Sequence, residues 1–564
     1  MSRLNPLNHG IANIHAAALL LGAAGLLSRI LGMLRDRLLA SQFGAGRELD
    51  IYYAAFQIPD FLYVLFLLGA ASSAILPLFQ ETLARDPEEA RSFVSQLATL
   101  FFIGAAGMAI AAFFLAPFLM RALVPGFSES ERIATVTLTR IMLLSPIFFG
   151  ISGILSSVVE SFQRFFAYAL SSILYNLGIM VGIVAFLPVF GFAGLGIGVA
   201  FGALLNFLVL FFPVRTLGFA PMPVWGKMQK NVKRVLFISL PRVLSVSLSQ
   251  LTLMALVALG SVLAPGSISV FALAQNLYFV PIGIFGTSYA VPLFPRLNRA
   301  AIEKEGELFF REFFFGMRAI LFWVIPSVAL FLVLRAHIVR VGLGGGIFSW
   351  EDTRLTAAML AVLICGLGAG SILLLLIKGF YAIGETWAPF FINIGASLMS
   401  IASAFSLVRL MGTDAPLAGV ISGLLRVGDL ASAQVLGLGI GYAIGVLANG
   451  IGLYFVLMAR ARKKFGGTHP QFPWTALLKI GIAALGAGVV TYGVRVSFSE
   501  TLPLITFFQV FLQGALSGLA GMGTYFAILL LLKSEDVAAF LHSLQKRLLK
   551  IKVLPKGWSG EEIK

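Results

Sequence analysis

Residues 15–70 read "HAAALLLGAAGLLSRILGMLRDRLLASQFGAGRELDIYYAAFQIPDFLYVLFLLGA", two long apolar runs on either side of a short charged segment. A helix rises about 1.5 Å per residue, so about 20 apolar residues cross the hydrocarbon core of a bilayer. Both runs approach that length, and the segment between them carries Gly44 and Gly46, which are typical of turns. The stretch predicts a hairpin of two membrane-spanning helices.

The same pattern recurs along the whole chain. Of its 564 residues, 59% are hydrophobic and only 12% are charged, and the mean hydropathy is +0.95. We expect spans near residues 15–34, 50–79, 92–121, 133–160, 166–189, 193–213, 233–263, 268–293, 313–337, 355–383, 387–410, 432–459, 475–496 and 504–532. Barrel strands alternate apolar and polar residues, whereas these runs stay apolar for much longer. The sequence predicts an all-α polytopic membrane protein with about fourteen transmembrane helices.

The basic residues follow one face of this predicted bundle. The chain has 41 Lys and Arg against 25 Asp and Glu, a formal net charge of +16. Two loops and the C-terminal tail on that face carry Arg215, Lys227, Lys230, Lys233, Arg234, Arg460, Arg462, Lys463, Lys464, Lys546, Arg547, Lys550, Lys552 and Lys556. Opposite loops, such as "LPVFGFAG" (187–194) and "LAPGS" (263–267), are uncharged. This asymmetry predicts that both termini are cytoplasmic, and it accounts for most of the net charge without nucleic acid as a partner.

Residues that serve catalysis are sparse. Cys365 is the single cysteine, and the five histidines are scattered without metal-ligand spacing. No P-loop or nucleophile elbow is present. We therefore expect no enzyme activity, no cofactor and no metal site. The basic tail, residues 534–564, is expected to lie along the anionic inner leaflet or to extend as a solvated helix.

An internal repeat predicts the domain organisation. Pro77-Leu78-Phe79 matches Pro292-Leu293-Phe294 at an offset of 215 residues, and Phe162 matches Phe380 at an offset of 218. Six helices separate the partners, so the halves are expected to be parallel repeats around a central cavity. The expected segments are a first six-helix lobe at 1–220, a second at 221–465, helices 13 and 14 at 466–533, and the tail at 534–564.

Several charges fall inside the first two spans. An intramembrane charge costs about 2.5–3.5 kcal/mol on insertion scales, so each needs a partner, water or a ligand. Arg29 and Asp36 are seven residues apart and share a helix face, and Asp50 and Gln57 repeat that spacing. Asp60 lies well inside an apolar run. Three other charges are expected in an exposed turn: Arg37, Arg47 and Glu48.

These residues also carry a family resemblance. The chain contains "SRILGMLRD" (28–36), "FGAGRELD" (43–50), "QIPDFL" (57–62), "ILPLFQE" (75–81), "VPGF" (124–127), "SVSLSQ" (245–250) and "KGFYAIGET" (378–386). Together they resemble the MurJ/MviN family of the multidrug/oligosaccharidyl-lipid/polysaccharide exporter superfamily. The likeness is collinear from helix 1 to helix 14, and the first hairpin is its most specific part.

The resemblance implies a flippase that moves lipid II, the undecaprenyl-linked peptidoglycan precursor, outward across the bacterial inner membrane. It implies a cationic cavity between the lobes and a groove for the lipid tail beside helices 13 and 14. Arg29 and Arg35 would hold the pyrophosphate by charge-assisted hydrogen bonds. Asp36 and Asp50 would pair with arginines in one access state and release them in the other. The expected partners are the lipid-linked substrate, membrane lipids and the cell-wall synthesis machinery, with the chain acting as a monomer.

The chain departs from the family pattern in two helices. Tyr63-Val64 stands where members commonly carry an Arg-Arg pair, and Leu68 replaces a glutamate. In helix 8 the family's Ala-Asp-Arg-Leu becomes Ala274-Gln275-Asn276-Leu277. The expected cavity is therefore less cationic than the family's.

The substrate-binding candidates include four further residues: Asp60, Arg242, Gln275 and Asn276. We hypothesise that Arg242, in helix 7, supplies the charge that helix 8 lacks. The alternative is an arginine that reaches the cytoplasmic interface beside Pro241, as long basic side chains do near helix ends.

Three functions follow from these observations. Lipid II flipping is favoured by the motifs. Flipping of another polyprenyl-pyrophosphate saccharide is compatible with the altered helix-2 and helix-8 residues, since Arg29 could keep the pyrophosphate. A non-transporting scaffold of envelope assembly would explain the lost arginines, but the retained Arg29, Arg35, Asp36 and Asp50 argue against it. Cation-coupled drug export is disfavoured, because helix 7 has no acidic residue.

Overall fold

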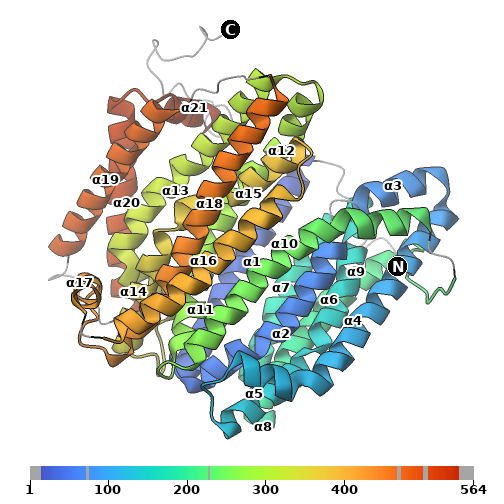
Figure 1. Ribbon diagram of the computed structural model, residues 1–564, viewed down its shortest axis with the longest axis horizontal. Coiled ribbons are helices and arrows are strands. Elements are labelled where there is room, and N and C mark those ends of the chain that lie inside the picture. Colours follow the sequence, from blue (N-terminus) through green and yellow to red (C-terminus); the bar gives the residue numbers. More distant parts are fainter. Residues whose placement is uncertain are drawn as a thin grey trace. The chain divides into compact units, whose positions relative to one another are not determined.

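The computed structural model describes residues 14–70, 75–226, 229–413, 415–466, 472–498 and 506–544, and every regular element among them is helical (Figure 1). The chain forms two compact units. Unit 1 comprises Met1–Leu273, Gly342–Leu355 and Asn393–Gly441, and unit 2 comprises Ala274–Val341, Thr356–Ile392 and Tyr442–Lys564.

The helices of unit 1 begin with the charged hairpin. They are α1 (Ile14–Phe43), α2 (Arg47–Ala70), α3 (Ile75–Arg85), α4 (Pro87–Leu123), α5 (Glu129–Met142), α6 (Leu144–Ser161), α7 (Phe165–Val181), η2 (Gly182–Phe186), α8 (Leu187–Phe190), α9 (Ala193–Thr216), α10 (Lys230–Ser261), most of α16 (Ala388–Met411), α17 (Pro416–Leu425) and η4 (Ala431–Val435).

Unit 2 holds the later helices. They are η3 (Ile282–Gly286), α12 (Thr287–Ile302), most of α13 (Gly306–Leu343), α15 (Leu367–Ala382), most of α18 (Leu436–Lys464), α19 (Trp474–Ser497), α20 (Phe507–Leu531) and α21 (Glu535–Leu544). Two helices are divided between the units: α11 (Ser267–Pro281) and α14 (Trp350–Ile364).

Length and composition confirm a multi-span membrane protein. In the described part of the chain, 11 helices are long and apolar enough to cross a membrane, or up to 12 if α14 and α15, bent by 46°, form one broken span. The hairpin helices α1 and α2 are not among the eleven, and the total of fourteen spans stays a prediction.

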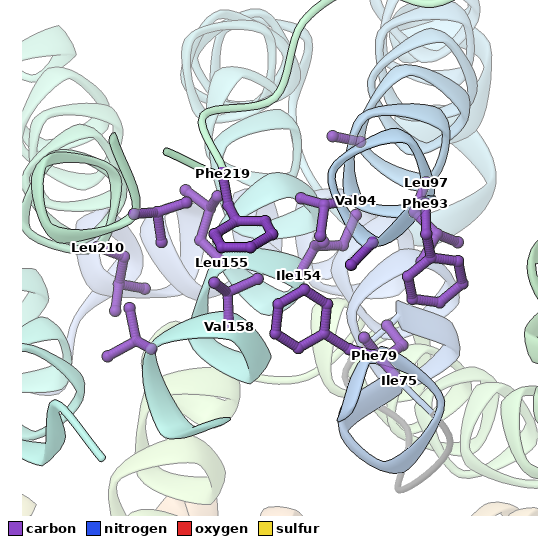
Figure 2. Close-up of a cluster of buried hydrophobic side chains, with 14 of the residues drawn as sticks. Ile75, Phe79, Phe93, Val94, Leu97, Ile154, Leu155, Val158, Leu210 and Phe219 are labelled. Carbon is purple, nitrogen blue, oxygen red and sulfur yellow. The ribbon is translucent and has the colours of Figure 1, made fainter. Parts of the chain in front are cut away.

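One buried hydrophobic cluster of unit 1 is formed mainly by apolar side chains from α3, α4, α6 and α9, with others from α7 and α10 (Figure 2). Phe79, from the repeated Pro-Leu-Phe motif, is fully buried there, and its ring packs edge-on against Phe219 at 5.4 Å. Phe162, the other residue of the predicted repeat, lies 6.3 Å from Phe79 between ring centroids. The motif residues of the first half therefore anchor a hydrophobic core.

Glycines bring α7 and η2 against α9. A Cβ on Gly198 would lie 2.4 Å from the Cα of Gly182, and one on Gly178 would lie 2.2 Å from the Cα of Gly202. Membrane helices lack a hydrophobic driving force for association, so such close backbone approach supplies much of the packing attraction.

We expect Gly198→Ala to destabilise the protein by about 1–3 kcal/mol, because the methyl group has no room at this crossing. Thermal unfolding of the detergent-solubilised chain measures the effect. Gly107→Ala in α4 is the matched control, since a Cβ there meets nothing within 4 Å. Equal unfolding temperatures for the two variants would contradict the close packing.

Three proline-containing helices have their interrupted backbone bonds replaced by side chains. Proline lacks an N–H, so the carbonyl four residues earlier loses its helical donor. Pro59 frees the Ala55 carbonyl, which accepts a hydrogen bond from Thr139 Oγ1 at 3.2 Å. Pro117 frees the Phe113 carbonyl, which accepts one from Arg140 Nε at 3.0 Å. Pro326 frees the Phe322 carbonyl, which accepts one from Tyr525 Oη at 2.6 Å. Such bonds are what allow proline inside a membrane helix.

In unit 2, α21 packs on α13 and α20. Val537 is fully buried, and Phe540 stacks on Phe526 with centroids 5.8 Å apart. Arg318 of α13 pairs with Asp536 at 2.8 Å. The predicted tail thus starts with a helix docked on the bundle, and its later residues, 545–564, lie outside the described residues.

Candidate functional site

The carboxylate of Asp50 is fully buried and bound to the start of α11. The N–H of Gly266 donates to Asp50 Oδ2 at 2.7 Å. The N–H and hydroxyl of Ser269 both donate to Asp50 Oδ1, at 2.8 and 2.7 Å. The first N–H groups of a helix have no intrahelical acceptors and carry partial positive charge. Asp50 therefore caps α11 from a different helix.

Two glycine turns enclose the loop between α1 and α2. Gly266 has φ +90°, and a Cβ there would lie 1.8 Å from the Ala45 carbonyl oxygen. Gly346 has φ +51°, and its Cβ would lie 2.0 Å from the Ser41 carbonyl oxygen. The same Ser41 carbonyl accepts the N–H of Ile347 at 3.0 Å. We call this contact of residues 41–50 with residues 261–269 and 345–352 the hairpin junction, all of it within unit 1.

Arg47 extends the hairpin junction to α5. Its Nε lies 3.3 Å from Glu131 Oε1, its Nη1 lies 3.8 Å from Asp50 Oδ2, and its guanidinium lies 4.9 Å from the Phe127 ring centroid. Glu131 also completes a capping box with Ser128 at the start of α5. The expectation that Arg47 sits in an exposed turn is wrong, because its side chain is only 22% exposed, whereas Glu48 is exposed as expected.

A surface ion pair joins two further segments of unit 1. Arg354 donates from Nη1 to Asp429 Oδ2 at 2.7 Å and from Nη2 to the carbonyl of Arg426. The guanidinium of Arg354 holds the pKa of the Asp429 carboxyl below its usual range. Asp429 is exposed and Arg354 is partly exposed at this bridge, so it contributes to orientation more than to stability.

Arg35 and Asp36 form a pair inside the bundle. Arg35 Nε and Nη2 donate to Asp36 Oδ1 at 2.9 and 2.8 Å, and Arg35 Nη1 donates to Asn176 Oδ1 at 3.4 Å. The amide nitrogen of Asn176 donates back to the Ser28 carbonyl at 3.4 Å. Asp36 is buried, whereas Arg35 is partly exposed. These bonds hold the Arg35 guanidinium of α1 next to α7 and leave part of it accessible.

Arg29 and Asp60 lie on the same two helices. Arg29, on α1, is partly exposed next to Ser28. Asp60, directly after Pro59 on α2, is partly exposed and lies within the electrostatic field of Arg35. The structure therefore brings Arg35, Asp36 and Asp60 into one charged group, while Asp50 belongs to the hairpin junction.

The other candidates are placed elsewhere. Gln275 and Asn276 lie on the part of α11 that belongs to unit 2, both partly exposed, and Gln275 bonds to Tyr442. The backbone of Arg242 lies in α10, but its side chain is outside the described residues. Within the described ranges, no group of three or more His, Cys, Asp or Glu side chains could hold a metal ion.

Sequence reasoning named the acceptor Asp50 but missed its donors in the hairpin junction. Ser269 and Gly266 follow Asp50 by 219 and 216 residues, and no local pattern links them. The segment "LAPGS" (263–267) did carry a signal, because Pro-Gly-Ser before an apolar run is typical of a helix start.

Comparisons with known proteins agree with one another. The family model described as lipid II flippase MurJ matches residues 39–512. A "Probable lipid II flippase MurJ" from Borreliella burgdorferi is 28% identical over 388 residues, covering 69% of this chain and 76% of the relative. One from Rhizobium tropici is 27% identical over 493 residues, covering 84% and 85%. A "Lipid II flippase MurJ" from Burkholderia cenocepacia is 26% identical over 412 residues, covering 71% and 79%.

Solved structures show the same fold. "Lipid II flippase MurJ, inward closed conformation" matches with a TM-score of 0.68 at 24% identity, covering 93% of this chain and 99% of that one. An inward-facing multidrug-resistance MATE family transporter of the MOP superfamily matches with a TM-score of 0.63 at 15% identity, covering 78% and 96%.

Proposed function

Because the chain belongs to the lipid II flippase MurJ family, we propose that it moves lipid II from the inner to the outer leaflet of the bacterial cytoplasmic membrane by alternating access. The observation that carries the proposal is the family match over residues 39–512, in a chain that keeps charged side chains inside its first hairpin. A transporter of this family does no covalent chemistry on its cargo, so its side chains need only bind, orient and release it.

The charged group on α1 and α2 suits a diphosphate lipid. Arg35 already presents a guanidinium whose orientation is fixed by Asp36 and Asn176. A planar guanidinium binds phosphate oxygens through two parallel hydrogen bonds. The diphosphate would therefore compete with Asp36 for Arg35, and Arg29 would add a second cation from the same helix.

The hairpin junction supports a gate. If both termini are in the cytoplasm, as the basic loops predict, α1 would end at the periplasmic face and the hairpin junction would close that side. The expected lobes, 1–220 and 221–465, would then separate there during the outward step, breaking the three hydrogen bonds of Asp50. Helices 13 and 14 (466–533) would border the lipid tail, with the chain working as a monomer.

A second candidate cargo is another polyprenyl-pyrophosphate saccharide. The observation that favours it is Tyr63-Val64 and Asn276 at positions where the family resemblance implies arginines. These substitutions change groups that would meet the saccharide or peptide, while Arg29 and Arg35 remain for the diphosphate.

The test is lipid II appearance in the outer leaflet of cells depleted of their own flippase and supplied with this chain. We expect appearance with the wild-type chain and none with Arg29→Ala, because the diphosphate loses one of its two cations. Membrane insertion of both is checked by immunodetection. Absence of lipid II in the outer leaflet, despite correct insertion of the wild-type chain, would move the assignment to the second candidate cargo.

A further inference from the structure

Next to the charged group, four aromatic rings from three helices lie near two carboxylates. Tyr63 of α2 contacts Phe149 of α6 with centroids 5.0 Å apart, and Phe149 contacts Tyr175 of α7 at 4.9 Å. We call the set Tyr63, Phe149, Tyr168 and Tyr175, with Asp60 and Glu160, the tyrosine cluster. All of its members lie in unit 1.

The rings meet edge to face, at interplanar angles of 68° and 79°. That geometry is favourable between aromatic rings. Tyr63 and Tyr175 are both partly exposed. The cluster is therefore not sealed from its surroundings.

The carboxylates lie at the two ends of this set. Asp60 lies within electrostatic range of Tyr63, Tyr175 and Arg35. Glu160 accepts a hydrogen bond from the Tyr168 hydroxyl, and Tyr168 is 39% exposed. Among the residues that the structure describes, no hydrogen bond is made to the Asp60 carboxylate. A carboxylate inside a membrane helix needs a partner, and this one is available to a ligand.

Further polar atoms point to the same conclusion. The hydroxyl of Tyr53 and the side-chain carbonyl of Gln57, about two turns and one turn before Asp60 on α2, are buried without hydrogen-bond partners in the described part of the chain. Buried polar groups are nearly always bonded, so such exceptions commonly mark a place for water or a ligand.

We infer that the tyrosine cluster is a saccharide subsite, in which Tyr63 and Tyr175 pack against a sugar ring and Asp60 accepts hydrogen bonds from its hydroxyl or amide groups. A sugar ring has apolar C–H faces and a rim of donors, which matches amphipathic phenols beside a carboxylate. The inference rests on the proposed function, because Arg35 at the edge of the cluster would hold the diphosphate to which the sugar is joined. Tyr63 then replaces a cationic contact with a ring contact and sets the preference for the glycan.

The test is native mass spectrometry of the purified full chain with three lipids: undecaprenyl diphosphate, the same lipid carrying one N-acetylglucosamine, and lipid II. We expect each sugar-bearing lipid to bind about tenfold more tightly than undecaprenyl diphosphate, and Tyr63→Leu and Asp60→Asn to remove that advantage. Binding of undecaprenyl diphosphate itself should stay unchanged in Tyr63→Leu, which also shows that this variant is folded.

Two further variants test whether the ring of Tyr63, at this position, is what binds the sugar. Tyr63→Phe keeps the ring and its packing on Phe149, so it should retain most of the advantage. Tyr492→Leu, at an exposed tyrosine of α19, is the matched control and should bind like wild type. If Tyr63→Leu leaves the sugar advantage intact, or lowers the affinity for all three lipids equally, the subsite is wrong.

The outcomes separate the subsite from the proposed function. If the chain binds the single-sugar lipid through Tyr63 but does not bind lipid II, the subsite is supported and lipid II is not the cargo. If lipid II binds equally well to the wild-type chain and to the Tyr63 and Asp60 variants, lipid II remains the cargo and the subsite is wrong. Equal affinity of the wild-type chain for all three lipids would also overturn the subsite.

Discussion

Asp50→Ala is expected to lower lipid II transport at least about tenfold, because it removes the acceptor that closes the hairpin junction. Alanine leaves the N–H groups of Gly266 and Ser269 without the carboxylate that they bind at 2.7 and 2.8 Å. An unsatisfied buried donor costs about 1–3 kcal/mol. A loss of about 3 kcal/mol in the closed state changes the ratio of closed to open junction by about 100-fold.

The measurement has a structural and a functional arm. Spin labels at Gln42→Cys and Val262→Cys, both exposed, report the opening of the hairpin junction in a Cys365→Ala background. Asp50→Ala should broaden and lengthen the distance distribution. Glu48→Ala, at an exposed acidic residue in the same first turn of α2, is the control and should change neither distance nor transport. An unchanged distribution in Asp50→Ala would show that the bonds do not hold the hairpin junction closed.

Arg35→Gln should abolish transport and destabilise the protein by about 3–5 kcal/mol, because it removes the guanidinium that donates two hydrogen bonds to the buried Asp36 carboxylate. Asp36→Asn should be destabilising too, since Arg35 then lacks its counter-ion. The double variant Arg35→Gln/Asp36→Asn carries no buried charge at either position, so its thermal stability should return toward wild type.

Transport separates two roles for Arg35. If the guanidinium binds the diphosphate, the double variant regains stability but not transport. If Arg35 only neutralises Asp36, transport returns together with stability, and the diphosphate assignment fails. Unfolding temperature and outer-leaflet lipid II, measured on the same four proteins, decide between these results.

Long apolar runs and the motifs of the first hairpin were enough to predict a helical membrane protein of this family, and the family match confirms the prediction. The hydrophobic signal is local, because every bilayer-crossing helix must carry it. The position of Arg47 could not be predicted, because Glu131 and Phe127 lie more than 75 residues away in the chain and pack only in the folded state. Asp50 was recognised through its motif, but its binding to the start of α11 depends on a contact between segments 216 residues apart.

The partly exposed Tyr63 illustrates a different limit. Its sequence context showed that an arginine was missing, but only the structure shows which groups surround the ring in its place. A lost charge alone does not indicate whether a position became inert or acquired another chemistry.

The carbonyl groups that prolines leave without a helical donor have a consequence for biosynthesis. Thr139 and Arg140 are adjacent on α5, yet one bonds the Ala55 carbonyl of α2 and the other the Phe113 carbonyl of α4. When α2 and α4 leave the ribosome they each hold a carbonyl that nothing in their own helix can satisfy, at a cost of several kcal/mol in lipid. The next helix to be synthesised satisfies both at once. Insertion of α5 is therefore the step at which the first helices become committed to one another, and a ribosome stalled before residue 139 would expose an incomplete bundle to quality-control proteases.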